Sequence, residues 1–129
     1  MNVLGTHVLL ELRNCDPQLL NDLPYIRQEL VKAAEQVGAH IVGESFHQFT
    51  PQGVTGILSI AESHISIHTW PEFGYAAADV FTCGDQTMPD RAAESIIAAL
   101  QCRDPQITQI RRGLRGVRIA ELQPARLTS

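Results

Sequence analysis

The chain has 129 residues, of which 44% are hydrophobic and 19% are charged, which is the size and composition of one globular domain. Its formal net charge of −4 argues against nucleic acid as the main partner, because phosphate binding requires a basic surface. Glu11 and Arg13 soon follow the first apolar run, so we expect neither a signal peptide nor a membrane span.

The first third of the chain predicts a strand, a helix and a second strand. Residues 3–12 are apolar and β-branched enough to form a strand. An apolar stripe over residues 19–37 predicts a helix, and Pro24 fits the first turn of a helix that begins near Leu23. Residues 39–49 again have the composition of a strand.

The rest of the chain is richer in strands. Strands are predicted over residues 54–61, 65–70, 75–82 and 106–118, and a helix over residues 89–101. The predicted order is therefore β-α-β-β-β-β-α-β.

This order favours an α+β fold, a two-layer sandwich in which two helices cover one face of a mainly antiparallel sheet. We see no linker or repeat, so residues 1–129 are interpreted as a single domain. The second face of such a sheet needs a partner, and we expect a homo-oligomer, most simply a dimer.

The three cysteines, Cys15, Cys83 and Cys102, form no Cys-X-X-Cys pair and have no histidine at a spacing typical of zinc sites. We therefore predict no metal site. An odd number of cysteines in an acidic chain favours a cytoplasmic location, where thiols stay reduced and available for chemistry.

Reactive residue types are concentrated between residues 53 and 85, which contain two histidines, the single tryptophan and a cysteine. Alternation along a strand places Ile65 and Ile67 on one face and His64, Ser66 and His68 on the other. The alternation alone is as typical of the solvent-exposed face of a sheet as of a catalytic site.

The motifs in this stretch are more specific than the alternation. The sequence AESHISIHTWPE is followed by GYAAADVFTCGD, and LGTHVLLEL, HQF and GVTG precede them. Together they resemble the signature of the small prokaryotic S-adenosylmethionine decarboxylases, which are pyruvoyl-dependent proenzymes. The resemblance implies self-cleavage between Glu62 and Ser63, giving a β chain of residues 1–62 and an α chain of residues 63–129.

The chemistry of this cleavage requires the Ser63 hydroxyl to attack the carbonyl carbon of Glu62 and form an ester. A base then removes the α-proton of residue 63, and the resemblance makes His68 the candidate. The product is a pyruvoyl group on residue 63, which forms a Schiff base with the substrate amine. Positions 63 and 68 face opposite ways on a straight strand, so the chain must bend at the bond, or the base must come from elsewhere.

The resemblance assigns roles to further residues. Cys83 matches the family's proton donor, and Thr55 stands where the family often has a serine that assists processing. Phe49, Trp70 and Glu72 match the positions that stack the adenine and hold the ribose of the substrate. Cys15 and Cys102 match no motif and are interpreted as structural.

The leading hypothesis is decarboxylation of S-adenosylmethionine to the aminopropyl donor for spermidine synthesis. A first alternative keeps the pyruvoyl chemistry but takes ornithine or arginine as the substrate. A second is a non-processed regulatory partner of a true enzyme, which would have no need of Ser63, His68 and Cys83 together.

Overall fold

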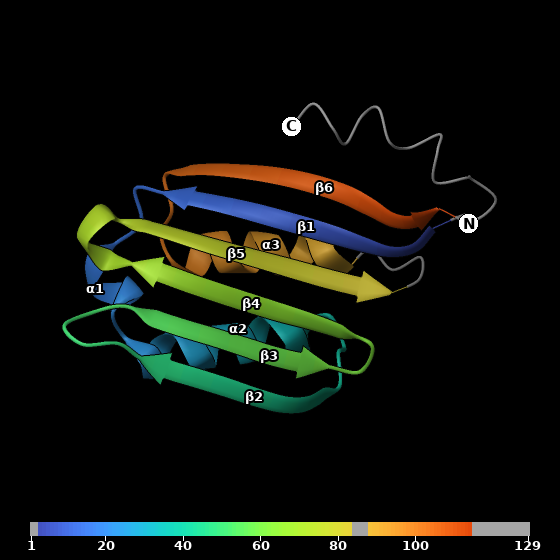
Figure 1. Ribbon diagram of the computed structural model, residues 1–129, viewed down its shortest axis with the longest axis horizontal. Coiled ribbons are helices and arrows are strands. Elements are labelled where there is room, and N and C mark those ends of the chain that lie inside the picture. The colour runs from blue at the N-terminus through green and yellow to red at the C-terminus, as the bar shows by residue number, and fades with distance from the viewer. Residues whose placement is uncertain (1–2, 84–87, 115–129) are drawn as a thin grey trace.

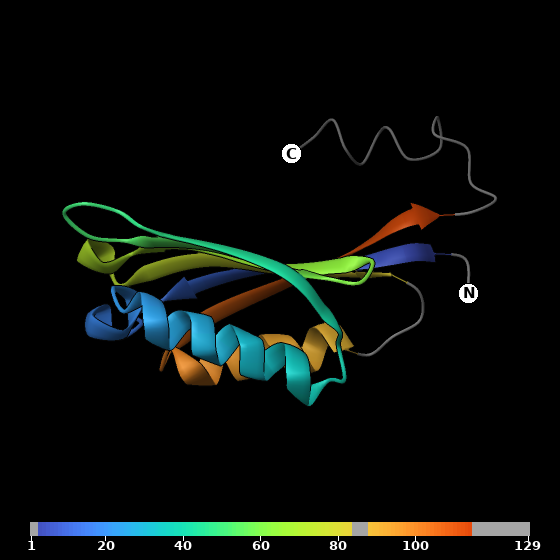
Figure 2. The same ribbon diagram turned by 90° about the horizontal axis from the view of Figure 1, so that it is seen from below.

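The computed structural model describes residues 3–83 and 88–114, and in these ranges the chain forms one antiparallel sheet with helices on one face (Figures 1 and 2). The sheet order is β2-β3-β4-β5-β1-β6. The strands are β1 (Val3–Arg13), β2 (Ile41–Gln48), β3 (Val54–Ile60), β4 (Ser63–Trp70), β5 (Tyr75–Cys83) and β6 (Asp104–Leu114). The helices are α1 (Pro17–Leu20), α2 (Leu23–Gln36) and α3 (Met88–Ala99), and a 3-10 turn η1 (Pro71–Phe73) joins β4 to β5.

The predicted α+β sandwich is confirmed, with differences in the bounds of some elements. The helical stripe is split into α1 and α2, because Asp16 and Asp22 each begin a helix by accepting a backbone N–H hydrogen bond. The longer helix starts at Leu23 with Pro24 in its first turn, as predicted. The final strand begins at Asp104, and residues 115–118 lie outside the described residues.

Figure 2 shows α2 and α3 side by side against the same face of the sheet, which we call the covered face. The core lies between the helices and the sheet. It consists of alternate residues of the central strands and of the sheet-facing residues of the helices. Its fully buried side chains include Val8, Leu10, Leu12, Ile26, Leu58, Ile65, Ile67, Val80 and Ile96. Burying each Leu or Ile contributes about 1.5–3 kcal/mol, so this layer fixes which side of each strand faces the helices.

The opposite side of the sheet carries no helix in the described part of the chain, and we call it the open face (Figure 2). Burial alternates along β4, where Ile65 and Ile67 are buried and His68 is exposed. The predicted alternation is therefore confirmed, with His64, Ser66 and His68 on the open face. None of the helices within residues 3–83 and 88–114 is long and apolar enough to cross a membrane.

Candidate active site

The bond between Glu62 and Ser63 lies where a tight turn enters β4. Ile60 pairs with Ser63, so only Ala61 and Glu62 connect β3 to β4. The strand thus begins two residues earlier than predicted, because the hairpin turn is shorter than the sequence suggested. Glu62 has a φ of 61°, a left-handed conformation that costs a side-chain-bearing residue about 1–2 kcal/mol. The bond therefore lies at the junction of the turn and β4, outside the interior of the ladder.

The carbonyl group of Glu62 has a specific partner at the end of β5. The Cys83 thiol donates a hydrogen bond to this carbonyl oxygen, with an Sγ–O distance of 2.7 Å. The contact joins the motif ESH to the motif TCGD, whose last two residues lie outside the described residues. A donor on this oxygen polarises the carbonyl and favours negative charge on it.

A cavity of about 300 Å³ opens beside this turn, between the end of the sheet and the helices. Glu62, Ser63 and Cys83 line it from the sheet, and residues 37–40, between α2 and β2, line it from the other side. Thr82 also lines the cavity, and motif reasoning gave it no role. Alternation along β5 was the available signal, because it turns the Thr82 side chain away from the sheet face that Phe81 and Cys83 share.

His68 is paired with Thr55 rather than with Ser63. The two residues are opposite each other in the β3–β4 register, and Thr55 Oγ1 lies 3.1 Å from His68 Nδ1. The register runs without a shift from Ser63 to His68, so His68 lies five residues along β4, about 16 Å away. It also lies on the open face, whereas Ser63 shares the face of Ile65. One chain therefore does not bring His68 to its own Ser63.

The three residues matched to substrate binding lie at the far end of the sheet from Ser63. Phe49 follows β2, Trp70 ends β4, and Glu72 lies in η1. The two aromatic side chains are 47% and 40% exposed, so their ring faces remain accessible. The Trp70 ring is 6.5 Å from the His68 ring. The predicted site residues thus form two groups: Glu62, Ser63 and Cys83 at one end of the sheet, and the remaining five toward the other.

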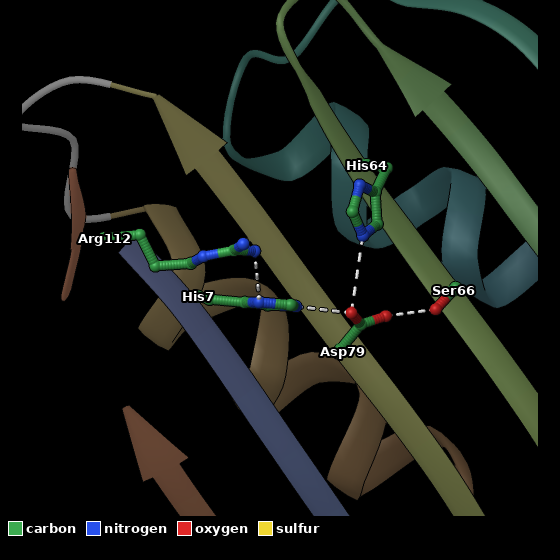
Figure 3. A network of polar contacts seen from close by, with 5 residues as sticks. All are labelled: His7, His64, Ser66, Asp79 and Arg112. Carbon is green, nitrogen blue, oxygen red and sulfur yellow. Dashed lines mark hydrogen bonds and ion pairs between the residues drawn. The ribbon is translucent and has the colours of Figure 1, made fainter. Parts of the chain in front are cut away.

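The open face carries a polar network around Asp79 that the sequence did not predict (Figure 3). Asp79 Oδ2 lies 2.5 Å from His7 Nε2 and 3.3 Å from His64 Nε2, and Ser66 donates to the other carboxylate oxygen. Arg112 lies 3.3 Å from His7 Nδ1. Burial raises the pKa of Asp79, but the hydrogen bonds from Ser66, His7 and His64 outweigh it and hold this pKa below its ordinary value.

His7, His64 and Asp79 are also the one trio in the described residues whose ligand atoms could hold a metal ion, since these atoms lie within 4.8 Å of one another. Both oxygens of Asp79 already accept hydrogen bonds. Arg112 places a positive charge beside the ring of His7, which opposes binding of a cation. We therefore interpret the trio as a hydrogen-bond network.

Asp79→Asn is expected to lower the free energy of unfolding by about 1–3 kcal/mol at neutral pH, because the amide leaves donors of the network without an acceptor. Asp79 has a lower pKa in the folded state than in the unfolded state. Its contribution is therefore present above the ordinary carboxyl pKa and is lost as pH falls through the lowered value. Thermal unfolding from about pH 7 to about pH 3 should show a smaller loss of stability in the variant than in the wild type.

The matched control for this substitution is Asp104→Asn. Asp104 accepts a hydrogen bond from Arg13 in an exposed ion pair, so the control should change stability far less. Equal losses in the two variants would contradict a special role of the network.

The other two cysteines lie away from the Glu62 turn. Burial, followed by the proximity of Cys102, raises the pKa of Cys15 to about 12, so this thiol is a poor nucleophile. Its Sγ donates to the Leu12 carbonyl, and that of Cys102 donates to the Arg13 carbonyl. These contacts support a structural interpretation of both.

Comparisons with known proteins agree with this geometry. The family model described as S-adenosylmethionine decarboxylase matches residues 6–113. An S-adenosylmethionine decarboxylase proenzyme from Thermodesulfovibrio yellowstonii is 50% identical over 114 residues, which cover 88% of this chain and 84% of that protein. One from Prochlorococcus marinus is 49% identical over 110 residues, covering 85% and 90% of the two chains.

A solved structure extends the similarity to the fold. The crystal structure of the adenosylmethionine decarboxylase from Aquifex aeolicus has a TM-score of 0.84 and 35% sequence identity, and the match covers 92% of this chain and 97% of that one. Fold and site define a small decarboxylase with one sheet and a strained Glu-Ser turn. The chain belongs to the S-adenosylmethionine decarboxylase family, as the resemblance predicted.

Proposed function

We propose that the chain is the proenzyme of a pyruvoyl-dependent S-adenosylmethionine decarboxylase that cleaves itself between Glu62 and Ser63. The product of the mature enzyme is the aminopropyl donor for spermidine synthesis. The observation that carries the proposal is the turn at this bond, where Glu62 is strained and its carbonyl oxygen accepts the Cys83 thiol. Membership of the family supplies the reaction to which this geometry is suited.

Processing begins when the Ser63 hydroxyl attacks the carbonyl carbon of Glu62. The developing negative charge falls on the oxygen that Cys83 already contacts, so the thiol acts as a preformed donor for this step. Removal of the α-proton of residue 63 then splits the ester and separates residues 1–62 from residues 63–129. The left-handed strain at Glu62 is released by the same step, which favours cleavage.

Ser63 is the first residue of β4 and lines the cavity, so a ketone made from it stays anchored to the sheet with open space beside it. When formed, the pyruvoyl group supplies the electron sink for loss of carbon dioxide from the substrate. Cys83 lies at the same end of the sheet and is our candidate for the acid that protonates the former α-carbon.

The separation of the site residues leads to a proposal about assembly. Two copies that join their open faces about a two-fold axis perpendicular to the strands place one end of each sheet against the opposite end of the other. Cys83 and the open-face side of the Glu62–Ser63 turn of one chain then lie opposite the partner subunit's His68, Thr55 and Trp70. This dimer supplies the α-proton base that a single chain does not bring to its own Ser63, and it covers the open sheet face.

The exposed aromatic pair favours an adenosyl substrate over an amino acid without a ring system. A flat purine binds well between aromatic faces, and the Glu72 carboxylate accepts hydrogen bonds from two ribose hydroxyls. Ornithine and arginine have no purine ring for the aromatic faces and no ribose hydroxyls for Glu72. The presence of Ser63, His68 and Cys83 argues against a non-processed regulatory partner. The cytoplasmic location stays a prediction.

The function is tested by release of carbon dioxide from S-adenosylmethionine, ornithine and arginine, measured side by side on the cleaved protein. We expect turnover of S-adenosylmethionine alone at a measurable rate. Trp70→Ala should weaken its binding by about tenfold to a hundredfold, because one aromatic stacking surface is lost. Faster turnover of ornithine or arginine would contradict the assignment of the substrate.

A further inference from the structure

Thr82 has a buried hydroxyl without a partner, and this hydroxyl lies beside the scissile bond. The residue is only 4% exposed, and its Oγ1 makes no hydrogen bond with any of the described residues. Buried hydroxyls in folded proteins nearly always have a partner, since an unpaired one loses the hydrogen bonds that water gave it. A buried hydroxyl without a partner at the wall of a cavity indicates an interaction that forms during function.

The register of the sheet identifies the nearest candidate for that interaction. His64 pairs with Phe81 and Ile65 pairs with Val80 across β4 and β5. One position further in the same register, Ser63 stands opposite Thr82, and the parity of both strands places their side chains on the covered face. Directly opposed residues have Cβ atoms about 4.5–5.5 Å apart, which is within reach of a hydrogen bond between two short hydroxyl side chains.

Both hydroxyl-bearing residues also line the same cavity. The Glu62 carbonyl is held from the other side by Cys83, which follows Thr82 in β5 and has the opposite parity. Two consecutive residues of β5 thus lie next to the two reacting groups. The Cys83 thiol contacts the carbonyl oxygen of Glu62, and the Thr82 hydroxyl lies next to the nucleophile.

We propose that Thr82 is a positioning residue for self-cleavage: its hydroxyl accepts a hydrogen bond from Ser63 and orients the Ser63 oxygen toward the Glu62 carbonyl carbon. In the step that follows, a bond forms between Ser63 Oγ and the Glu62 carbonyl carbon, and the bond from that carbon to the Ser63 nitrogen breaks. The hydroxyl proton ends on the freed amine, so nothing is oxidised or reduced and Thr82 is unchanged. The inference rests on the proposed cleavage at this bond.

The test uses the full-length precursor with Thr82→Val, which keeps the branched shape and removes only the hydroxyl, and Thr82→Ser, which keeps the hydroxyl. Cleavage is followed with time by mass under denaturing conditions. We expect Thr82→Val to slow cleavage by at least about tenfold, the factor for one ordinary hydrogen bond, and Thr82→Ser to restore most of the rate. The uncleaved Thr82→Val chain should resist hydroxylamine, because it stops as an amide before the ester forms.

A matched control comes from the next strand. Thr6 is opposite Thr82 in the β1–β5 register and is 8% exposed, but it does not line the cavity. Thr6→Val should therefore cleave at the wild-type rate. Thr82→Val should also unfold at a temperature no lower than that of the Ser63→Ala precursor, since it removes an unpaired buried hydroxyl. Slow cleavage at unchanged stability cannot come from a misfolded chain.

Other outcomes would overturn the role of Thr82 or the cleavage on which it rests. If Thr82→Val cleaves as fast as the wild type, Thr82 has no part in positioning. The same conclusion follows if Thr82→Ser is as slow as Thr82→Val, or if Thr6→Val is equally slow. A wild-type chain that stays whole overturns the proposed cleavage itself, and with it the role of Thr82.

Discussion

Ser63→Ala is expected to leave the protein as a single uncleaved chain of 14.2 kDa with no decarboxylase activity. The substitution removes the only hydroxyl placed to attack the Glu62 carbonyl from within the turn, and it removes the atom from which the ketone is made. Mass under denaturing conditions should show two fragments for the wild type, the second blocked to N-terminal sequencing. The variant should show one mass and release no carbon dioxide.

The control for this change is Ser59→Ala. Ser59 lies on neighbouring β3, opposite His64, and is not at the turn. It should be cleaved like the wild type. Two fragments from Ser63→Ala would rule out Ser63 as the nucleophile, whereas one mass in both the wild type and the variant would rule out self-processing of the expressed chain.

Co-expression of Ser63→Ala with His68→Ala should restore cleavage that neither variant shows alone. His68→Ala retains the nucleophile but lacks the base, and it should stall at an ester that hydroxylamine splits. In a mixed dimer, the open-face side of its Glu62–Ser63 turn lies against the intact His68 of the partner subunit. With random assortment, about half of the His68→Ala chains lie in mixed dimers and become cleavable. Mass distinguishes the two chains without any tag.

The matched negative control pairs His68→Ala with a chain that carries both substitutions, so that no subunit supplies the base. This mixture should stay uncleaved. Failure of the first mixture to cleave, while the wild type does, would show that the base does not come from a partner. Full cleavage of His68→Ala by itself would instead remove His68 from the role of base.

The sequence predicted the fold well where a local pattern decides it. Pro24 fixed the start of α2, and the alternation of Ile65 and Ile67 with His64 and His68 correctly assigned the two faces of β4. The difference in parity between residues 63 and 68 required either a bend at the bond or a base from elsewhere, and the unshifted register of β4 supports the second. Each of these depends on residues close together in the chain.

The sequence did not predict features that depend on distant pairing or on an unusual conformation. Ala61 and Glu62 include none of the residues typical of tight turns, so the two-residue connection and the left-handed Glu62 were missed. The Asp79 network requires β1 to lie beside β5, which brings His7 to a residue 72 positions away. The motifs also grouped Ser63 with Trp70 in one site, although the strand predicted over residues 65–70 places them at opposite ends of β4.

The short turn between β3 and β4 has a consequence for how the mature enzyme refolds. The proposed cleavage would turn this hairpin into two separate polypeptides held together by the β3–β4 ladder and the shared core. Before cleavage, the protein refolds as a single chain. After it, refolding requires an encounter between two, so the stability of the mature protein depends on its concentration. Folding before the proposed cleavage therefore avoids the entropic cost of bringing two chains together.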